Sequence, residues 1–141
     1  MVDVSDKPAT ARRAVAEAFV TLEQETLTAI IDGQTTKGDV LTVAEVAGVM
    51  GAKRTGELIP LCHPLGLDHV QVEATLDPEL PGVRVTAAAR VTGRKGVEME
   101  ALTAVAVACL TVYDMVKAVD KGMVIQEVKL VSKAKRPAHG S

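Results

Sequence analysis

The sequence predicts an α+β sandwich, in which an antiparallel sheet carries helices packed on one face. Two observations favour this class. Segments with apolar residues at every second position, typical of half-buried strands, flank segments of helical character along the 141-residue chain. The chain is also 48% hydrophobic with one Phe, one Tyr and no Trp, so it must build an aliphatic core. Its length suits one such core, and we expect a single domain over residues 1–141.

The first part of the chain is predicted to contain an arm, a strand and a short helix. Residues 1–12 have mixed charge and no helical stripe, so we expect an extended arm. Small and apolar residues recur at every second position over residues 13–24, which indicates a half-buried strand. A short helix over residues 25–33 would end at Gly33.

The middle of the chain is predicted to form a second helix and then two strands. The helix would cover residues 41–59, with Thr42 as its N-cap and Glu45 completing a capping box. Alternating segments at 69–76 and 82–93 flank a proline-rich turn, which is typical of two strands connected in sequence.

The last part of the chain is predicted to contain a long helix and a final strand. Residues 97–122 have carboxylates in the first turn and lysines near the last, as the helix dipole favours, and Gly122 would end the helix. Residues 123–135 alternate again and form a strand, and 136–141 are expected to be a flexible tail. The resulting order matches a split βαβ, ferredoxin-like sandwich. In this fold the second face of the sheet is often covered by a partner chain.

The centre of the long helix is unusually apolar. The run from Ala101 to Tyr113 has 13 residues, against the roughly 20 that a membrane-spanning helix needs. A helix that is apolar on all sides is expected to be buried on all sides. Because one small domain has trouble covering such a helix completely, we expect part of it to lie against another subunit.

Charge and cysteine content exclude several classes of protein. The 16 basic and 18 acidic residues nearly balance, so no overall field attracts nucleic acid or a membrane surface. Cys62 and Cys109 are not spaced like a disulfide framework, and no signal peptide precedes them. We therefore expect a reduced, cytoplasmic protein.

The stretch LIPLCHPL places Cys62 and His63 between Pro60 and Pro64. A catalytic zinc site needs about three ligands, and the remaining cysteine and histidines have no ligand spacing. A nucleophile and base are disfavoured because adjacent side chains of an extended segment point to opposite sides. A buried cysteine beside a hydrogen-bonded histidine is a purely structural alternative. Because each proline favours extended backbone before it, we favour a preset recognition edge for a planar polar ligand.

A second group of candidates lies in YDMVKAVDK. Asp114 and Lys117 are three residues apart and would share a helix face, with Lys121 one turn later. Such a pair is usually a solvated surface salt bridge that contributes little. This pair continues a helix too apolar to be exposed, and at a buried edge it would have catalytic potential.

Two further groups are weaker signals. Glu98 and Glu100 complement the dipole at the start of the long helix. Helix N-termini also bind anions, and Arg94 and Lys95 would add positive charge there. Lys37, in the turn TTKGD, taken alone is a surface lysine.

Four stretches together resemble the cyclic pyranopterin monophosphate synthase family (MoaC) of molybdenum cofactor biosynthesis: MVDVSDK, TKGDVL, AKRTGELIPLCHPL and TGRKGVEMEALTAVAVACLTVYDMVKAVDKGM. The resemblance covers essentially the whole chain, although the family usually carries a further short segment before MVDVS. It implies a ferredoxin-like homohexamer, a trimer of dimers with active sites at the dimer interface. The implied reaction converts 3′,8-cyclo-7,8-dihydroguanosine 5′-triphosphate to cyclic pyranopterin monophosphate, releases pyrophosphate, and needs no cofactor.

The resemblance also implies roles for particular residues. Asp114 and Lys117 would be the central acid/base pair, and Lys37 a second proton-transfer lysine. The substrate would be bound by Leu61, Cys62 and His63 along its purine-derived ring, by Met99 and Glu100 on its other side, and by Asp3 and Lys7 of the arm closing over it. No residue is assigned to a metal.

Two other functions stay open at the level of sequence. Ferredoxin-like domains also serve as non-catalytic regulatory domains that bind small molecules, and fold alone does not decide between them. A sensor has no need of Asp114, Lys117, Lys37 and His63 together, whereas a cyclase does. A zinc-binding module would retain stoichiometric metal after purification.

Overall fold

The computed structural model describes residues 10–35, 37–63 and 66–137 of the chain. Strands and helices follow one another in the predicted order, except that the second helix is divided in two. In chain order the elements are β1 (Thr10–Thr21), α1 (Gln24–Ile31), α2 (Val40–Lys53), α3 (Thr55–Leu58), β2 (His69–Asp77), β3 (Gly82–Gly93), α4 (Glu98–Val116) and β4 (Val124–Pro137).

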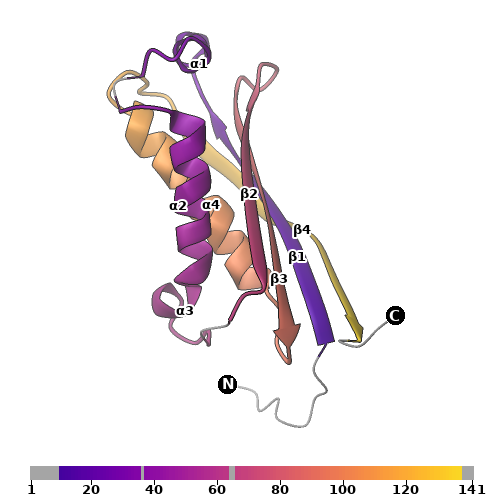
Figure 1. The fold of residues 1–141 in the computed structure, drawn as a ribbon. Helices are drawn as coiled ribbons and strands as arrows, with labels where there is room; N and C mark the ends of the chain where they lie inside the picture. Colours follow the sequence, from indigo (N-terminus) through magenta and orange to yellow (C-terminus); the bar gives the residue numbers. More distant parts are fainter. Residues whose placement is uncertain (1–9, 36, 64–65, 138–141) are drawn as a thin grey trace.

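The four strands form one antiparallel sheet in the order β2-β3-β1-β4. Helices α2 and α4 cover one face of this sheet, and none of the helices in the described part of the chain covers the other (Figure 1). The predicted α+β sandwich with split βαβ topology is thus confirmed. Successive side chains of β1 point to opposite faces of the sheet, and Ala14, Ala16 and Ala18 are fully buried on the face that the helices cover. These short side chains let α4 lie close to the sheet.

Two glycines allow α2 to lie close to α4. A Cβ built on Gly48 would lie 3.0 Å from the carbonyl oxygen of Ala104, and one on Gly51 would lie 2.8 Å from Cγ2 of Val107. Neither contact leaves room for a methyl group. The spacing of three residues puts both glycines on one face of α2, so the backbone of α2 lies against the backbone of α4 at Gly48 and against a side chain of α4 at Gly51.

The predicted second helix was wrong in its start and in its length. Asp39 is the N-cap of α2, because its carboxylate accepts the backbone N–H of Thr42 at 3.2 Å and the Thr42 hydroxyl at 2.8 Å. Glu45 completes no capping box, since its Oε2 accepts the N–H of Ala74 in β2 at 2.9 Å. The helix ends at Lys53, and α3 continues as a separate short turn.

The predicted end of the long helix was also wrong. Helix α4 ends at Val116, well before Gly122. The buried carboxylate of Asp120 accepts the N–H of Glu23 at 2.8 Å and that of Gly122 at 3.0 Å. These bonds fix a turn between α4 and β4 and attach it to the start of α1.

The boundaries of the arm and the tail differ from those expected. Residues 10–12 belong to β1, where they pair with β3 and β4, and Arg136 and Pro137 belong to β4. Residues 1–9 and 138–141 lie outside the described residues.

Helix α4 is not buried on every side within one chain, as we expect of so apolar a helix in a small domain. Its sheet-facing residues are fully buried, but Leu110 is 59% and Tyr113 40% exposed. By length and composition α4 is the one helix of the described chain that could cross a membrane. Because most of it packs into the core against β1, β3 and α2, we assign it as a core helix with one open stripe.

Candidate active site

The three predicted catalytic side chains meet in the structure. Lys117 Nζ lies 2.9 Å from Asp114 Oδ1, and Lys37 Nζ lies 3.3 Å from Oδ2 of the same carboxylate. Lys37 Nζ also donates to the backbone carbonyl of Asp114 at 3.2 Å. The turn TTKGD by itself predicts only a surface position for Lys37, whereas the family resemblance predicts a lysine that transfers protons. We call these three residues the acid/base cluster.

The electrostatics of the acid/base cluster follow from its hydrogen bonds. The bonds from Lys117 and then Lys37, together with their charges, lower the pKa of the Asp114 carboxyl. The carboxylate is therefore charged at neutral pH, and each oxygen has its own ammonium donor. This arrangement suits proton transfer and the binding of developing negative charge. All three side chains are about half exposed in the single chain, so water can reach them.

The predicted recognition residues line a hollow at the other end of α4. This hollow, which we call the recognition pocket, has a volume of about 510 Å³. Its walls come from the loop after α3, from the start of β1 and from the segment leading into α4. Its lining includes Leu61, Cys62, His63, Met99 and Glu100, together with Arg12, Arg94 and Lys95.

The floor of the recognition pocket is a buried carboxyl group. Glu100 is 2% exposed, and its burial raises the pKa of its carboxyl group. Cys62 Sγ lies 3.8 Å from Glu100 Oε2. Burial, followed by the charge of Glu100, raises the pKa of the Cys62 thiol. A neutral thiol is a weak nucleophile but still a donor, so Cys62 is placed for contact rather than for covalent chemistry.

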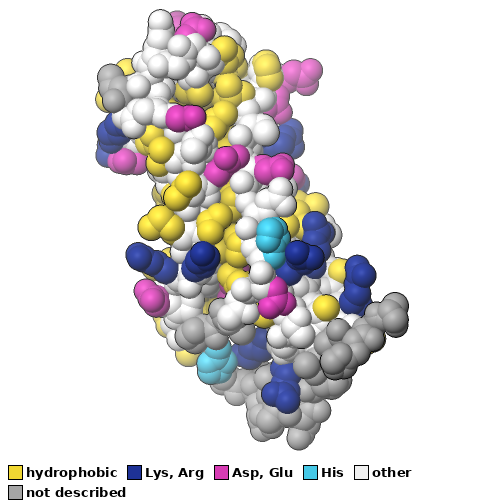
Figure 2. Space-filling model, in the orientation of Figure 1, with side chains coloured by type: hydrophobic (Ala, Val, Ile, Leu, Met, Phe, Trp, Pro, Cys, Tyr) yellow, Lys and Arg dark blue, Asp and Glu magenta, His cyan; other side chains and the backbone are white. Residues whose placement is uncertain are grey.

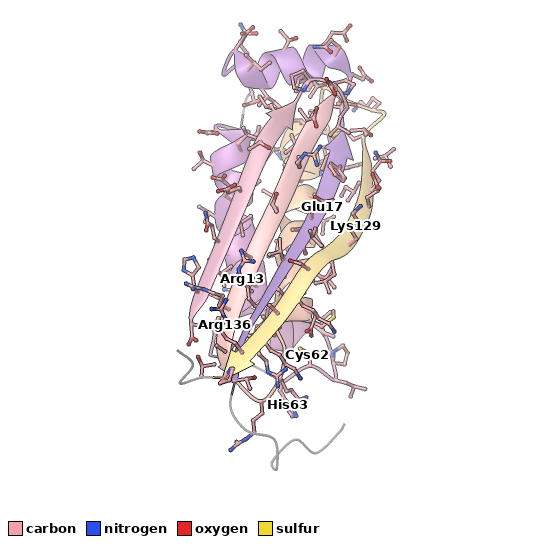
Figure 3. All side chains as sticks on the ribbon, turned by 90° about the vertical axis from the view of Figure 1, so that its right-hand side faces the viewer. Arg13, Glu17, Cys62, His63, Lys129 and Arg136 are labelled. Atoms are coloured by element: carbon pink, nitrogen blue, oxygen red, sulfur yellow. The ribbon has the colours of Figure 1, made fainter. Side chains whose placement is uncertain are left out.

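The loop that carries Cys62 has the expected backbone geometry at the first of its two prolines. Ile59, which precedes Pro60, has extended backbone at φ −106° and ψ 110°. Cys62 is partly buried and His63 exposed, and both lie at the same end of the molecule (Figure 3). Among the residues that the structure describes, no group of three or more His, Cys, Asp or Glu side chains could hold a metal ion.

The acid/base cluster and the recognition pocket lie at opposite ends of α4. Asp114 follows Glu100 by fourteen residues, which corresponds to about 21 Å along the helix axis. The chain therefore does not bring the two groups of predicted residues together by itself. Asp3 and Lys7, predicted to close over the site, lie outside the described residues.

Sequence reasoning missed basic residues on the strands. Arg12, at the start of β1, lines the recognition pocket and an adjoining hollow of about 300 Å³ that also reaches Lys133 and Lys135 of β4. The assignment of residues 1–12 to an arm hid this position. Arg12 of β1 is the cross-strand neighbour of Lys135 in β4. This pairing groups the basic residues, but the register of two strands cannot be predicted from a single sequence.

The fold and these groups define a small α+β sandwich with acid/base side chains and a partly basic pocket. Comparison with known proteins gives the family. The sequence profile of the MoaC family matches residues 1–136, and the chain belongs to this family.

Several relatives are similar over nearly the whole chain. A protein of Cereibacter sphaeroides strain ATCC 17029, called cyclic pyranopterin monophosphate synthase, is 61% identical over 133 residues, which are 94% of this chain and 84% of that protein. Proteins of the same name in Methylobacterium sp. strain 4-46 and Methylobacterium nodulans are 61% and 60% identical over 134 residues, or 95% of this chain and 84% of each relative.

Proposed function

We propose that this chain converts 3′,8-cyclo-7,8-dihydroguanosine 5′-triphosphate to cyclic pyranopterin monophosphate with release of pyrophosphate, as a lyase of molybdenum cofactor biosynthesis. The observation that carries the proposal is the carboxylate of Asp114 held between Lys37 and Lys117, in a chain 61% identical to proteins called by that activity. Such a rearrangement breaks and forms C–N bonds and closes a cyclic phosphate. It needs several proton transfers and neutralisation of phosphate charge, and lysines beside a carboxylate supply both.

The recognition pocket has the chemistry that the purine-derived ring and the phosphates require. The neutral Cys62 thiol and the imidazole of His63 offer hydrogen bonds to ring atoms, while Leu61 and Met99 offer apolar contact. Arg12, Arg94 and Lys95 bring positive charge to the same hollow. A triphosphate is the ligand that such a combination favours. In the proposal Asp3 and Lys7 close over it, and no cofactor takes part.

We further propose that two chains together form each active site. The exposed stripe of α4 runs from the recognition pocket to the acid/base cluster. It has the 3,4 spacing of one helix face and consists of Met99, Leu102, Ala106, Leu110 and Tyr113.

The stripe has its smallest residue in the middle. Ala106 is seven residues from Met99 and seven from Tyr113, so a twofold axis beside Ala106 would place two α4 helices antiparallel and in close contact. Each acid/base cluster would then lie beside the partner's recognition pocket, although the two groups of one chain are about 21 Å apart along α4. Covering the exposed apolar side chains of Leu110 and Tyr113 would favour this pairing. The assembly that we propose is a homohexamer, a trimer of such dimers, in the cytoplasm.

Turnover of the proposed substrate tests the function. Purified protein incubated with 3′,8-cyclo-7,8-dihydroguanosine triphosphate should release pyrophosphate and form the cyclic pyranopterin monophosphate. Binding of the substrate without pyrophosphate release would favour a regulatory domain instead. Activity should persist after exhaustive chelation; loss on chelation with rescue by zinc would indicate a metal enzyme.

Mixing two inactive variants tests the shared site. His63→Ala removes a recognition residue, and Lys117→Ala removes a residue of the acid/base cluster. If each site takes one part from each chain, a mixed dimer has one intact site, so random mixing should restore about a quarter of the wild-type rate. Mixed oligomers that stay as inactive as either parent would contradict a two-chain site.

A further inference from the structure

Three exposed arginines gather on the uncovered face of the sheet. Arg13 of β1 and Arg90 of β3 are direct cross-strand neighbours, and Arg136 of β4 lies two residues along from the β4 neighbour of Arg13. Together they line a hollow of about 530 Å³, which we call the arginine hollow. Figure 3 shows Arg13 and Arg136 near one end of this face. In Figure 2, several Lys and Arg side chains lie together in the lower half of the molecule, on the side where Figure 1 shows the sheet.

Small residues form the floor of the arginine hollow. Ala134 of β4 is the cross-strand neighbour of Arg13, and Ala11 of β1 lies between Thr92 of β3 and Arg136 of β4. Both alanines line the hollow. Because a methyl group is much shorter than an arginine side chain, the surface is concave here. A small ligand can therefore reach the sheet while the guanidinium groups surround it.

The positive charge of these arginines has no counter-charge on the same chain. Within the described residues, none of Arg13, Arg90 and Arg136 has an ion-pair partner within 4.0 Å. Like charges directly opposite each other on a sheet are destabilising. Elsewhere on β3, Arg84 is compensated, since its Nη2 lies 2.9 Å from Asp77 Oδ2. The pair of Arg13 and Arg90 therefore favours an anion that comes from outside the chain.

The lining of the arginine hollow has a net positive charge. Four arginines, including Arg12, stand against the single carboxylate of Asp68, which gives a net charge of +3. The Asp68 carboxylate accepts the Thr92 hydroxyl at 2.9 Å. Arg12 also lines the recognition pocket, and its Nε donates to the Gly93 carbonyl at 3.3 Å. Arg13 points to the opposite face of the sheet from Arg12, because successive side chains of a strand alternate.

Acidic residues limit the extent of the positive surface. Glu17 of β1 and Glu73 of β2 are the cross-strand neighbours of Thr86, which lies four residues from Arg90 along β3. Four residues of a strand cover about 13 Å. A nucleic acid or an anionic membrane would extend over these carboxylates and be repelled by them, whereas a small anion would not.

We propose that the arginine hollow binds a small anion with two phosphate groups, such as pyrophosphate, at a site separate from the proposed active site. Guanidinium groups bind phosphate oxygens through pairs of parallel N–H donors. The Cα atoms of direct cross-strand neighbours are about 4.5–5.5 Å apart, so Arg13 and Arg90 can both reach one phosphate. Arg136 is the diagonal neighbour of Arg13 at about 7–8 Å, which suits the second phosphate.

The assignment rests on the chemistry of the arginine hollow. Pyrophosphate is also the anion that the proposed reaction releases, so turnover is one source of this ligand. Binding can be measured without turnover. The site therefore stands or falls independently of the proposed function.

Calorimetric titration of the full chain with inorganic pyrophosphate tests the site. At about 0.15 M salt, where weak long-range attraction is screened, the wild type should show saturable binding that Arg90→Gln and Arg136→Gln each weaken at least tenfold. Lys95→Gln removes a charge from the recognition pocket and should leave this binding unchanged, which separates the two sites. Lys53→Gln on α2 is the matched loss of charge away from both and should also have no effect.

Turnover and oligomer mass provide the controls. Arg90→Gln and Arg136→Gln should keep the wild-type rate of pyrophosphate release, because neither arginine lines the recognition pocket or belongs to the acid/base cluster. Unchanged pyrophosphate binding in both folded variants would overturn the proposal. Orthophosphate that binds as tightly as pyrophosphate would overturn the assignment to a ligand with two phosphates. A lower oligomer mass in either variant, measured by sedimentation, would overturn the site by assigning the arginines to a contact between copies.

Discussion

The carboxylate of Glu45 in α2 accepts the backbone N–H of Ala74 in β2 at 2.9 Å. Strand β2 is at the edge of the sheet, so this N–H has no neighbouring strand to bond. The side chain of a covering helix thus takes the place of a missing strand and blocks an edge that could otherwise pair with another chain.

Glu45→Ala should therefore destabilise the fold by about 1–3 kcal/mol, because it leaves a partly buried donor unsatisfied. Glu45→Gln is the matched control, since its amide oxygen can still accept the bond. Chemical denaturation followed by circular dichroism measures the difference. Equal loss in both variants would show that the charge, and not the acceptor, matters.

Gly48→Ala should destabilise the contact between α2 and α4. The new Cβ would lie 2.9 Å from Val72 Cγ1 and 3.0 Å from the carbonyl oxygen of Ala104, and backbone cannot yield as a flexible side chain does. Overpacking of this kind costs about 1–3 kcal/mol, well above the gain in helix propensity. The melting temperature should fall, whereas Val46→Ala on the exposed side of the same helix should change it little. An unchanged melting temperature for Gly48→Ala would mean that the helices can separate without penalty.

Lys117→Ala and Asp114→Asn should each lower the rate of pyrophosphate release by about 10²-fold or more. Lys37, on the other carboxylate oxygen, does not fill the position of the Lys117 ammonium 2.9 Å from Oδ1, and an amide at 114 carries no charge and is no base. Folding and oligomer mass should be unchanged, since both side chains lie at the polar end of α4. Lys121→Ala removes a lysine whose one hydrogen bond within the described residues goes to the Lys117 carbonyl, and this variant should retain activity. Near-wild-type rates in both folded variants would refute the catalytic assignment.

Much of the fold could be predicted from the sequence because alternation of small and apolar residues fixes strands locally. Strand β3 has the bounds that were predicted, 82–93. In β1 the buried alanines at every second position make the alternation of a half-buried strand visible in the sequence. The helix ends could not be predicted, because long-range bonds decide them. The carboxylate of Glu45 accepts a hydrogen bond from strand β2 rather than from its own helix. The carboxylate of Asp120 accepts one from the N–H of Glu23, which is 97 residues away in the sequence.

The candidate site was predictable in its members but not in its arrangement. A helix places Asp114 beside Lys117 from spacing alone, and the family resemblance suggested Lys37. The separation of these residues from Cys62 and Glu100 follows from the length of α4. The apolar pattern of α4 predicts a contact with another subunit, but it does not indicate that the two chains share each active site, which is a proposal.

Stability should decrease as the pH rises through the titration of Glu100. Burial raises the pKa of this carboxyl above its ordinary value of 4.5, so between 4.5 and the raised pKa the folded chain binds more protons than the unfolded one. The favourable contribution of the protonated group is complete below pH 4.5 and is lost above the raised pKa. Glu100→Gln should flatten this part of the pH profile of unfolding. A wild-type slope in the variant would assign the effect to other carboxyl groups.

The single tyrosine of the chain has a consequence for spectroscopy. The protein has no tryptophan, so Tyr113 is its only strong intrinsic fluorophore. Its ring is 40% exposed on α4, beside Asp114 and on the stripe that we expect to contact another copy. The emission of an unlabelled sample therefore reports on one known location. The fluorescence of Tyr113 can therefore be used to follow dilution, substrate addition and mixing of variants in real time.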